Sequence, residues 1–146
     1  MTTFNAANTF TGDLTVTSST AFSSTSSWMF SIGANGVNNS IAGTGDLLLE
    51  GAFNLDLSGA GTSLCDSWSL VNTATLNETY AGTFNLTGFN DLGGNVWEQD
   101  LGGILYEYAG STGLLSVTAI PEPSTLGLLM AAGAGILFRR RCKDLV

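Results

Sequence analysis

Residues 40–71 read SIAGTGDLLLEGAFNLDLSGAGTSLCDSWSLV, and this stretch decides the fold class. It contains three short apolar runs, at 46–50, 53–57 and 68–71, separated by glycines and by small polar residues. Apolar runs of this length, bounded by turn-forming residues, are typical of β-strands rather than helices. The stretch therefore predicts short strands joined by tight turns.

The same pattern extends in both directions along the chain. Further runs predict strands at 14–17, 28–32, 83–86, 105–108 and 114–117. No proline occurs between positions 5 and 119, and no segment before Ser124 has helical periodicity. We therefore expect an all-β body.

Weak internal repeats bear on the architecture of that body. TGDL at 11–14 recurs at 44–47, and the pattern G-x-F-N-L at 51–55 recurs at 82–86. Repeats of this spacing are typical of stacked supersecondary units, which favours the end of a parallel β-helix with a cap. A β-sandwich or jelly roll, which also places a turn about every 8 to 12 residues, stays open as the alternative.

Charge is segregated along the chain. Residues 1–138 carry eleven acidic side chains and no Lys or Arg, whereas Arg139, Arg140, Arg141 and Lys143 all lie in the last eight positions. A body without cationic side chains cannot neutralise phosphates, so nucleic-acid binding is excluded. The excess of acids favours solubility instead.

The side chains needed for most catalytic sites are missing. The chain has no histidine, which excludes Ser-His-Asp and Cys-His arrangements and His-based metal sites. The remaining candidates are the paired carboxylates that a glycosidase needs, and three such pairs can be considered: Asp46 with Glu50, Asp56 with Asp66, and Glu98 with Asp100. Each acid is equally well explained as a solvated side chain. We therefore predict no catalytic residues, no cofactor and no enzymatic activity.

Oxygen-rich loops raise the question of calcium. NDLGGN at 90–95 is turn-like, but it lacks the ligand spacing and the acidic twelfth position of a calcium loop. We interpret it as an ordinary loop and predict no metal site.

Aromatic residues are expected mainly in the core. Of Trp28, Trp68 and Trp97, the last stands beside Glu98 near a Gly-Gly turn, so it is predicted to be the most exposed. Trp97 is therefore the candidate for stacking against a carbohydrate ring. Cys65 is expected to be a small buried apolar residue.

The end of the chain, residues 119–146, reads AIPEPSTLGLLMAAGAGILFRRRCKDLV. Pro121 and Pro123 favour an extended hinge, Ser124 is a helix N-cap, and the following run has no charge up to position 138. A helix over 124–138 is about 22 Å long, which is short of a ~30 Å hydrocarbon core. Arginine side chains that reach the interface offset such a shortfall. We predict a transmembrane helix at 124–138, with the basic tail 139–146 on the cytoplasmic side and the acidic body outside.

Pro121, Glu122 and Pro123, followed by an apolar helix and by Arg139, Arg140 and Arg141, closely resemble the PEP-CTERM sorting signal. The resemblance implies recognition by an exosortase, a membrane-embedded cysteine peptidase that processes the signal near the motif. It also implies release or transfer to the cell surface, often in Gram-negative bacteria that make exopolysaccharide. The chain departs from many relatives because residues 142–146 extend past the arginines.

A second resemblance concerns the body. NTFTGDLTV at 8–16 looks like the autotransporter-associated β-strand repeat, and 40–71 looks like the last rungs of such passengers. The resemblance implies a parallel β-helix whose terminal rung is capped, with the strands after Tyr80 as the cap. Because MTTFNAANTFTGDLTV at 1–16 has no basic segment followed by an apolar one, we expect a longer protein whose export signal lies upstream.

These expectations divide the chain into an acidic extracellular passenger at 1–118 and a sorting signal at 119–146. The leading functional hypothesis is a structural or adhesive protein of the surface or extracellular matrix, with exopolysaccharide as a partner. It would cross the inner membrane transiently through its C-terminal helix. The alternatives are a carbohydrate-binding module of a larger secreted enzyme and a permanently anchored membrane protein.

Overall fold

The computed structural model describes residues 1–5, 7–8 and 12–119, and every regular element in these ranges is a β-strand. The expectation of an all-β body is confirmed. The first sheet contains, in spatial order, β1 (Thr2–Phe4), β4 (Thr20–Phe22), β7 (Asp46–Leu49) and β10 (Asn77–Tyr80). The second sheet contains β2 (Ala7–Asn8), β5 (Ser27–Ser31), β8 (Ala52–Asp56) and β11 (Asn85–Leu86).

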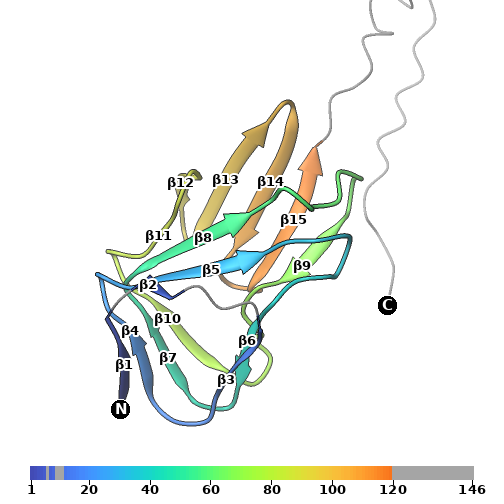
Figure 1. Ribbon diagram of the computed structural model, residues 1–146. Coiled ribbons are helices and arrows are strands. Elements are labelled where there is room, and N and C mark those ends of the chain that lie inside the picture. Colours follow the sequence, from blue (N-terminus) through green and yellow to red (C-terminus); the bar gives the residue numbers. More distant parts are fainter. Residues whose placement is uncertain (6, 9–11, 120–146) are drawn as a thin grey trace, which may run out of the picture.

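A third sheet completes the winding of the chain. It pairs β3 (Leu14–Val16) with β6 (Ile41–Gly43), and a parallel bridge from Ile41 to Val71 continues it. All pairs within the three sheets are parallel, so the chain passes from the first sheet to the second and third and then returns to the first. We call these passages circuit 1 (2–16), circuit 2 (20–43), circuit 3 (46–71) and circuit 4 (77–86). Figure 1 shows them stacked from blue to green.

The circuits differ in length, which explains why the sequence repeats are weak. In the first sheet Thr2 pairs with Thr20, Thr20 with Leu47, and Asp46 with Asn77, so in-register residues are 18, 27 and 31 positions apart. The TGDL repeat does not mark equivalent places, since its first copy leads into β3 of the third sheet and its second into β7 of the first. Register here is set by which side chains face inward, not by a constant sequence spacing.

Inward-facing side chains form one apolar core along the stack. Successive residues of a strand point to opposite faces, and β5 accordingly buries Trp28 and Phe30 while Met29 between them is only half-buried. Phe30 meets Phe53 of the next circuit with ring centroids 4.9 Å apart, and Phe53 meets Phe84 at the same distance. Each fully buried ring of this kind stabilises the fold by about 1.5–3 kcal/mol.

Polar side chains occupy the corners of the winding. Asp46 accepts a hydrogen bond from Ser19 Oγ at 3.0 Å and another from Asn77 Nδ2 at 2.8 Å, which links the start of circuit 3 to the corner before β4 and to the start of circuit 4. The buried amide of Asn39 is satisfied within its own circuit, because it accepts from Ser31 N and donates to the Met29 carbonyl.

One corner requires glycine. Gly43 has a φ of +141°, and a Cβ on it would collide with the carbonyl oxygen of Val16 in the circuit beneath. Only glycine combines this backbone conformation with so close an approach of two chains. The corner therefore fixes how β6 lies on β3.

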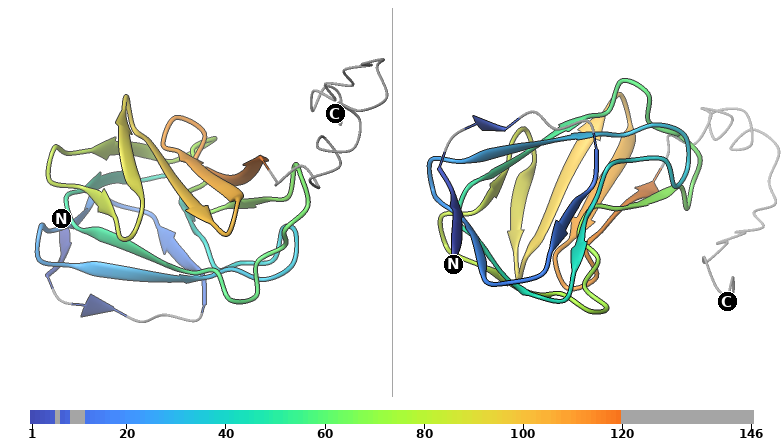
Figure 2. Two further views of the ribbon diagram at one scale, coloured as in Figure 1. Left: turned by 90° about the horizontal axis from the view of Figure 1, so that it is seen from above. Right: turned by 60° about the horizontal axis from the view of Figure 1, so that its bottom comes forward.

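An antiparallel sheet covers the C-terminal end of the stack. Its strands, in spatial order, are β12 (Asn90–Gly93), β13 (Val96–Leu101), β14 (Ile104–Ala109), β15 (Leu114–Ala119) and β9 (Ser67–Ser69). We call it the cap sheet. Figure 2 shows the cap sheet, yellow to orange, and circuit 1, dark blue, at opposite ends of the stack.

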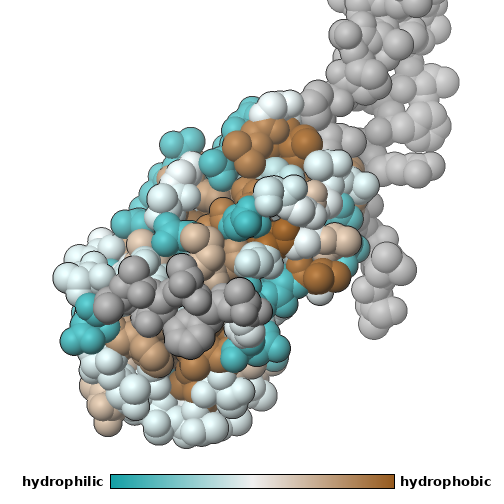
Figure 3. Space-filling model, viewed as in Figure 1, coloured by the Kyte–Doolittle hydropathy of each residue, from teal (hydrophilic) through white to brown (hydrophobic). Residues whose placement is uncertain are grey.

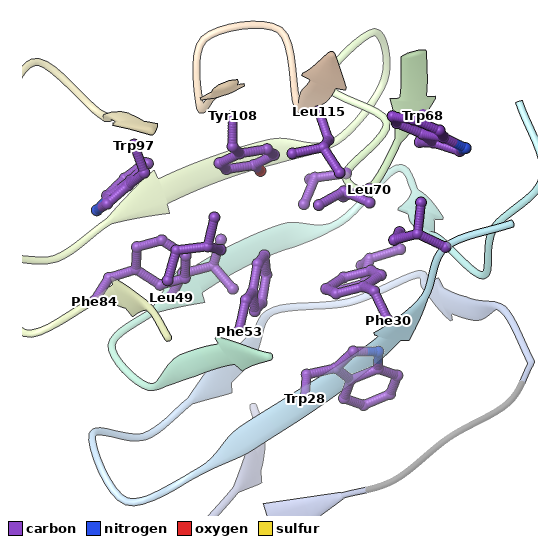
Figure 4. Packing of buried hydrophobic residues seen from close by; sticks show 14 of the residues in the cluster. Trp28, Phe30, Leu49, Phe53, Trp68, Leu70, Phe84, Trp97, Tyr108 and Leu115 are labelled. Atoms are coloured by element: carbon purple, nitrogen blue, oxygen red, sulfur yellow. The ribbon is translucent and has the colours of Figure 1, made fainter. Parts of the chain in front are cut away.

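Aromatic rings join the cap sheet to the circuits. Figure 4 shows Trp97, Tyr108 and Leu115 on one side of the core, facing Phe84 and Phe53 on the other. The ring centroids of Trp97 and Phe84 are 5.0 Å apart, and those of Tyr108 and Phe53 are 6.5 Å apart. The cap sheet and the circuits therefore share a single core.

Two expectations from the sequence are wrong. Residues 90–95 are not simply a loop, because 90–93 form β12 and only the following residues turn into β13. Cys65 is exposed rather than buried, since it lies in the connection before β9 with a φ of +75°.

No helix within residues 1–5, 7–8 and 12–119 is long and apolar enough to cross a membrane. The helix predicted at 124–138 lies outside the described residues.

Candidate functional site

Trp97 is not available for stacking against a ligand. It is 4% exposed and lies among Tyr80, Phe84 and Tyr108, with ring centroids 5.0–5.8 Å away. The neighbouring Glu98 points to the other face of β13 and is half-buried. Trp97 is the most exposed of the three tryptophans, but the prediction that it is open to a ligand is wrong, because strand alternation sends consecutive residues to opposite faces and the acidic neighbour marks the outer one.

The other two tryptophans are not available for stacking against a ligand either. Trp28 and Trp68 are each 1% exposed, and the indole of Trp68 donates to the carbonyl oxygens of Gly33 and Ala34. A carbohydrate-binding platform needs exposed ring faces. None of the three tryptophans presents one.

Two tyrosines form the tightest polar contact of the core. The hydroxyls of Tyr80 and Tyr108 are 2.7 Å apart, and Tyr108 is fully buried on the inner face of the cap sheet. Burial raises the pKa of both hydroxyls above their ordinary value because the charged phenolate is disfavoured there. The pair stays protonated at neutral pH and serves to join circuit 4 to β14.

The candidate carboxylate pairs have local roles. Asp56 accepts from the backbone N of Ser58, and Asp66 accepts from that of Ser63, so each orders its own turn. Hydrogen bonds from Asn77 and then Ser19 lower the pKa of Asp46, and the side chain and backbone of Ser58 do the same for Asp56. Asp46 and Asp56 therefore stay ionised as acceptors, which is not the behaviour of a general acid.

Glu98 and Asp100 both lie on the outer face of β13. Glu98 stands directly opposite Glu107 of β14, and residues 1–119 contain no Lys or Arg to compensate. Among the described residues no group of three acids or cysteines could hold a metal ion. The outer face of the cap sheet is thus an acidic surface without an assembled site.

A shallow hollow of about 320 Å³ lies where the connection after β5 meets the start of β3. It is lined by Gly12, Asp13, Ser31, Val37, Asn38 and Asn39. Its polar atoms already bond within the protein: Asp13 accepts from Ser40, and Asn38 donates to the Ser69 carbonyl. Sequence reasoning did not anticipate this hollow, since its walls come from two circuits.

The segment that follows the cap sheet gives the decisive comparison. Residues 119–141 match a PEP-CTERM protein-sorting motif. The PEP-CTERM motif implies exosortase-dependent sorting to the cell surface or extracellular space and association with the membrane through the signal. No curated protein and no solved structure gives a significant match. The resemblance of 8–16 and 40–71 to an autotransporter-associated repeat gains no support from these comparisons.

The PEP-CTERM motif begins where the described fold ends. Its first matched residue, Ala119, is the last residue of β15 and pairs with Leu105 of β14. The predicted motif Pro121, Glu122 and Pro123, and the basic residues Arg139, Arg140 and Arg141, lie outside the described residues. The sorting signal is therefore attached directly to an interior strand of the cap sheet, flanked by β14 and β9.

Proposed function

We propose that this chain is a non-catalytic structural or adhesive protein of the cell surface or extracellular matrix, delivered there by an exosortase. The match of residues 119–141 to the PEP-CTERM motif carries the proposal. In this proposal Pro121, Glu122 and Pro123 are the recognition motif, 124–138 spans the inner membrane transiently, and Arg139, Arg140 and Arg141 hold the end on the cytoplasmic side.

The body supports a role without catalysis. Aspartates such as Asp46 and Asp56 act as corner and turn acceptors, the tyrosines pair with each other or with the backbone, and the sequence supplies no histidine. We infer that the winding is the end of a parallel β-helix closed by the cap sheet. Parallel pairing in three sheets supports this, since sandwiches are built from antiparallel strands.

The carbohydrate-binding alternative loses its main support. It depended on an exposed Trp97, and that ring is part of the core. Exopolysaccharide is still a proposed partner, but only because the proposed protein belongs to the extracellular matrix.

The test is the intact mass of the mature protein from fractionated native cells that carry the full gene. A tag inserted between Gly93 and Gly94, at an exposed turn, leaves the sorting signal untouched. We expect a surface form that ends near residues 121–123, and a membrane-bound form with an intact C-terminus in cells that lack the exosortase. A Pro121→Ala/Pro123→Ala variant is the matched control and should stay unprocessed.

A mass that retains residues 139–146 in the membrane of normal cells would contradict the proposal. The segment would then be a permanent anchor. Processing that continues in the exosortase-deficient strain would point to a different peptidase.

A further inference from the structure

The sorting signal leaves the folded body at one end of the cap sheet. Ala119, the last residue of β15, pairs with Leu105 at the start of β14. The β13–β14 hairpin turns at this same end, since Leu101 pairs there with Ile104. Figure 1 shows the tip of the hairpin beside the arrowhead of β15. The signal is therefore attached next to the hairpin tip.

The connection before β9 lies on the other flank of the attachment point. There the backbone N of Cys65 donates to the carbonyl oxygen of Val117 in β15, at 3.1 Å. Leu64 immediately precedes this contact. We define the exit face as the part of the cap sheet end that these segments form, residues 63–65, 101–104 and 118–119.

Exposed leucines lie on both flanks of the exit face. Leu101 is 41% exposed, and Leu64 is 40% exposed. Figure 3 shows apolar surface around the tip of the β13–β14 hairpin. Residues 101–106 and 108–121 carry no charged side chain. A single exposed leucine needs no explanation, but an uncharged apolar surface at a membrane attachment point indicates contact with the membrane.

The acids of β13 and β14 stand behind the exit face or at its rim. Glu98 and Glu107 are opposite each other, three residues back along their strands from Leu101 and Ile104. Asp100, at the rim, accepts a hydrogen bond from the backbone N of Gly103 at 2.6 Å, which holds it against the hairpin turn. Because charged carboxylates are costly to remove from water, this arrangement limits any lipid contact to the headgroup region.

The tether between the exit face and the membrane is short. Ser124, where the predicted membrane segment begins, is five positions after Ala119. Even fully extended, five residues span no more than about 18 Å, and a headgroup layer takes up about 5–7 Å of that reach. Since β15 is flanked by β14 and β9, the tether leaves between the two flanks that carry the exposed leucines.

We propose that the exit face rests on the lipid headgroups while the sorting signal holds the chain, with Leu101 and Leu64 touching the membrane on either side of the tether. The contact rests on the proposed function, because it needs the membrane segment at 124–138. Even one acyl chain gives only marginal, reversible membrane binding, and two partly exposed leucines give less. Cleavage near 121–123 therefore releases the body, which anionic lipids also repel.

Quenching of an added tryptophan by labelled lipid tests the contact. Leu101→Trp and the control Leu92→Trp are made in the full-length chain and reconstituted into phosphatidylcholine vesicles that carry a nitroxide at the top of the acyl chain. Leu92 is also exposed, but it precedes the other end of β13, and that strand is about 17 Å long. The native tryptophans are buried and give a constant background. We expect the added fluorescence to fall at least twofold for Leu101→Trp and to stay unchanged for Leu92→Trp.

Flotation with the vesicles distinguishes failure of this contact from failure of the proposed function. A chain that floats but shows no quenching at position 101, or equal quenching at 101 and 92, would overturn the contact and leave the membrane segment in place. A chain that does not float would refute the membrane segment and the contact together. Leu64→Trp is a second probe, on the other flank, and should be quenched like Leu101→Trp. Unchanged near-ultraviolet circular dichroism shows that each variant is folded.

Lengthening the tether tests what holds the contact. A ten-residue Gly/Ser insert between Ile120 and Pro121 lets the body move away from the membrane, and the same insert between Gly93 and Gly94 is the control. We expect the first insert to reduce the quenching of Leu101→Trp at least twofold and the second to leave it unchanged. Full quenching with the lengthened tether would mean that the exit face binds lipid by itself, which contradicts release of the body on cleavage.

Discussion

The Tyr80–Tyr108 hydroxyl pair allows a quantitative test of how the cap sheet is held to the circuits. Replacing either tyrosine with phenylalanine removes one oxygen and leaves the rings in place. Tyr108 is fully buried and Tyr80 half-buried, so the two single variants leave different groups behind. Their costs should differ for that reason.

The magnitudes follow from which hydroxyl loses its partner. Tyr80→Phe leaves the buried Tyr108 hydroxyl unpaired, which should cost about 2 kcal/mol of unfolding free energy. Tyr108→Phe leaves the hydroxyl of Tyr80, the less buried of the two side chains, so a smaller cost of about 1 kcal/mol is expected. The double variant leaves no unpaired group and should cost no more than about 1 kcal/mol.

The pH dependence provides an independent check. Burial raises the folded-state pKa of both tyrosines above about 10, the ordinary value in an unfolded chain. The stability that comes from keeping them protonated is therefore complete below pH 10 and is lost as pH rises through the folded-state pKa. Each tyrosine contributes a slope of up to about 1.4 kcal/mol per pH unit. The double variant should lose less stability between pH 10 and 11 than the parent.

The assay is urea unfolding followed by tryptophan fluorescence for the parent, both single variants and the double variant. The reasoning predicts a coupling energy of about 1–2 kcal/mol between the two sites. Costs that add within about 0.3 kcal/mol would show that the hydroxyls do not depend on each other. A parent whose urea midpoint stays constant up to pH 11 would contradict the assigned pKa directions.

Three further predictions concern the corners, the charge and the tryptophans. Gly43→Ala should lower the free energy of urea unfolding by at least about 2 kcal/mol, because the new side chain has a strained φ and overlaps Val16. Gly36→Ala is the control, with a φ of +75° and open space around it, and should cost about 1 kcal/mol. Raising NaCl should raise the melting temperature, because salt screens repulsion among acids that have no Lys or Arg partner in residues 1–119, and a flat response would contradict this. Iodide should not quench the tryptophan fluorescence of the folded body, and quenching would mean that Trp97 is more accessible than described.

The sequence predicted the strands that combine alternation with apolar residues. All eight predicted runs contain or overlap observed strands, from β3 to β15. β10 reads NETY and was missed because only its last residue is apolar, and β13 reads VWEQDL and was missed because acidic residues stand at its outward positions. β4 reads TAF, with two apolar residues between stretches of serine and threonine, and it was missed as well.

The candidate sites show the same difference between features that are local in the sequence and features that depend on the fold. The PEP-CTERM motif is contiguous, so its residues identify it without any fold. The position of Trp97 depends on which face of β13 meets circuit 4, a non-local fact that its neighbours in sequence do not contain. The alternation of Trp97 with Glu98 was nevertheless a usable signal for burial.

The unequal circuits have a consequence for how such a protein changes over generations. In-register residues are 18, 27 and 31 positions apart, yet the interior column from Phe4 to Tyr80 is continuous. Extra residues enter at the corners, where lengthening a connection costs little entropy. Insertions and deletions can therefore accumulate at the corners while the packed interior stays the same, so each corner is a place where new surface chemistry can arise without loss of the fold.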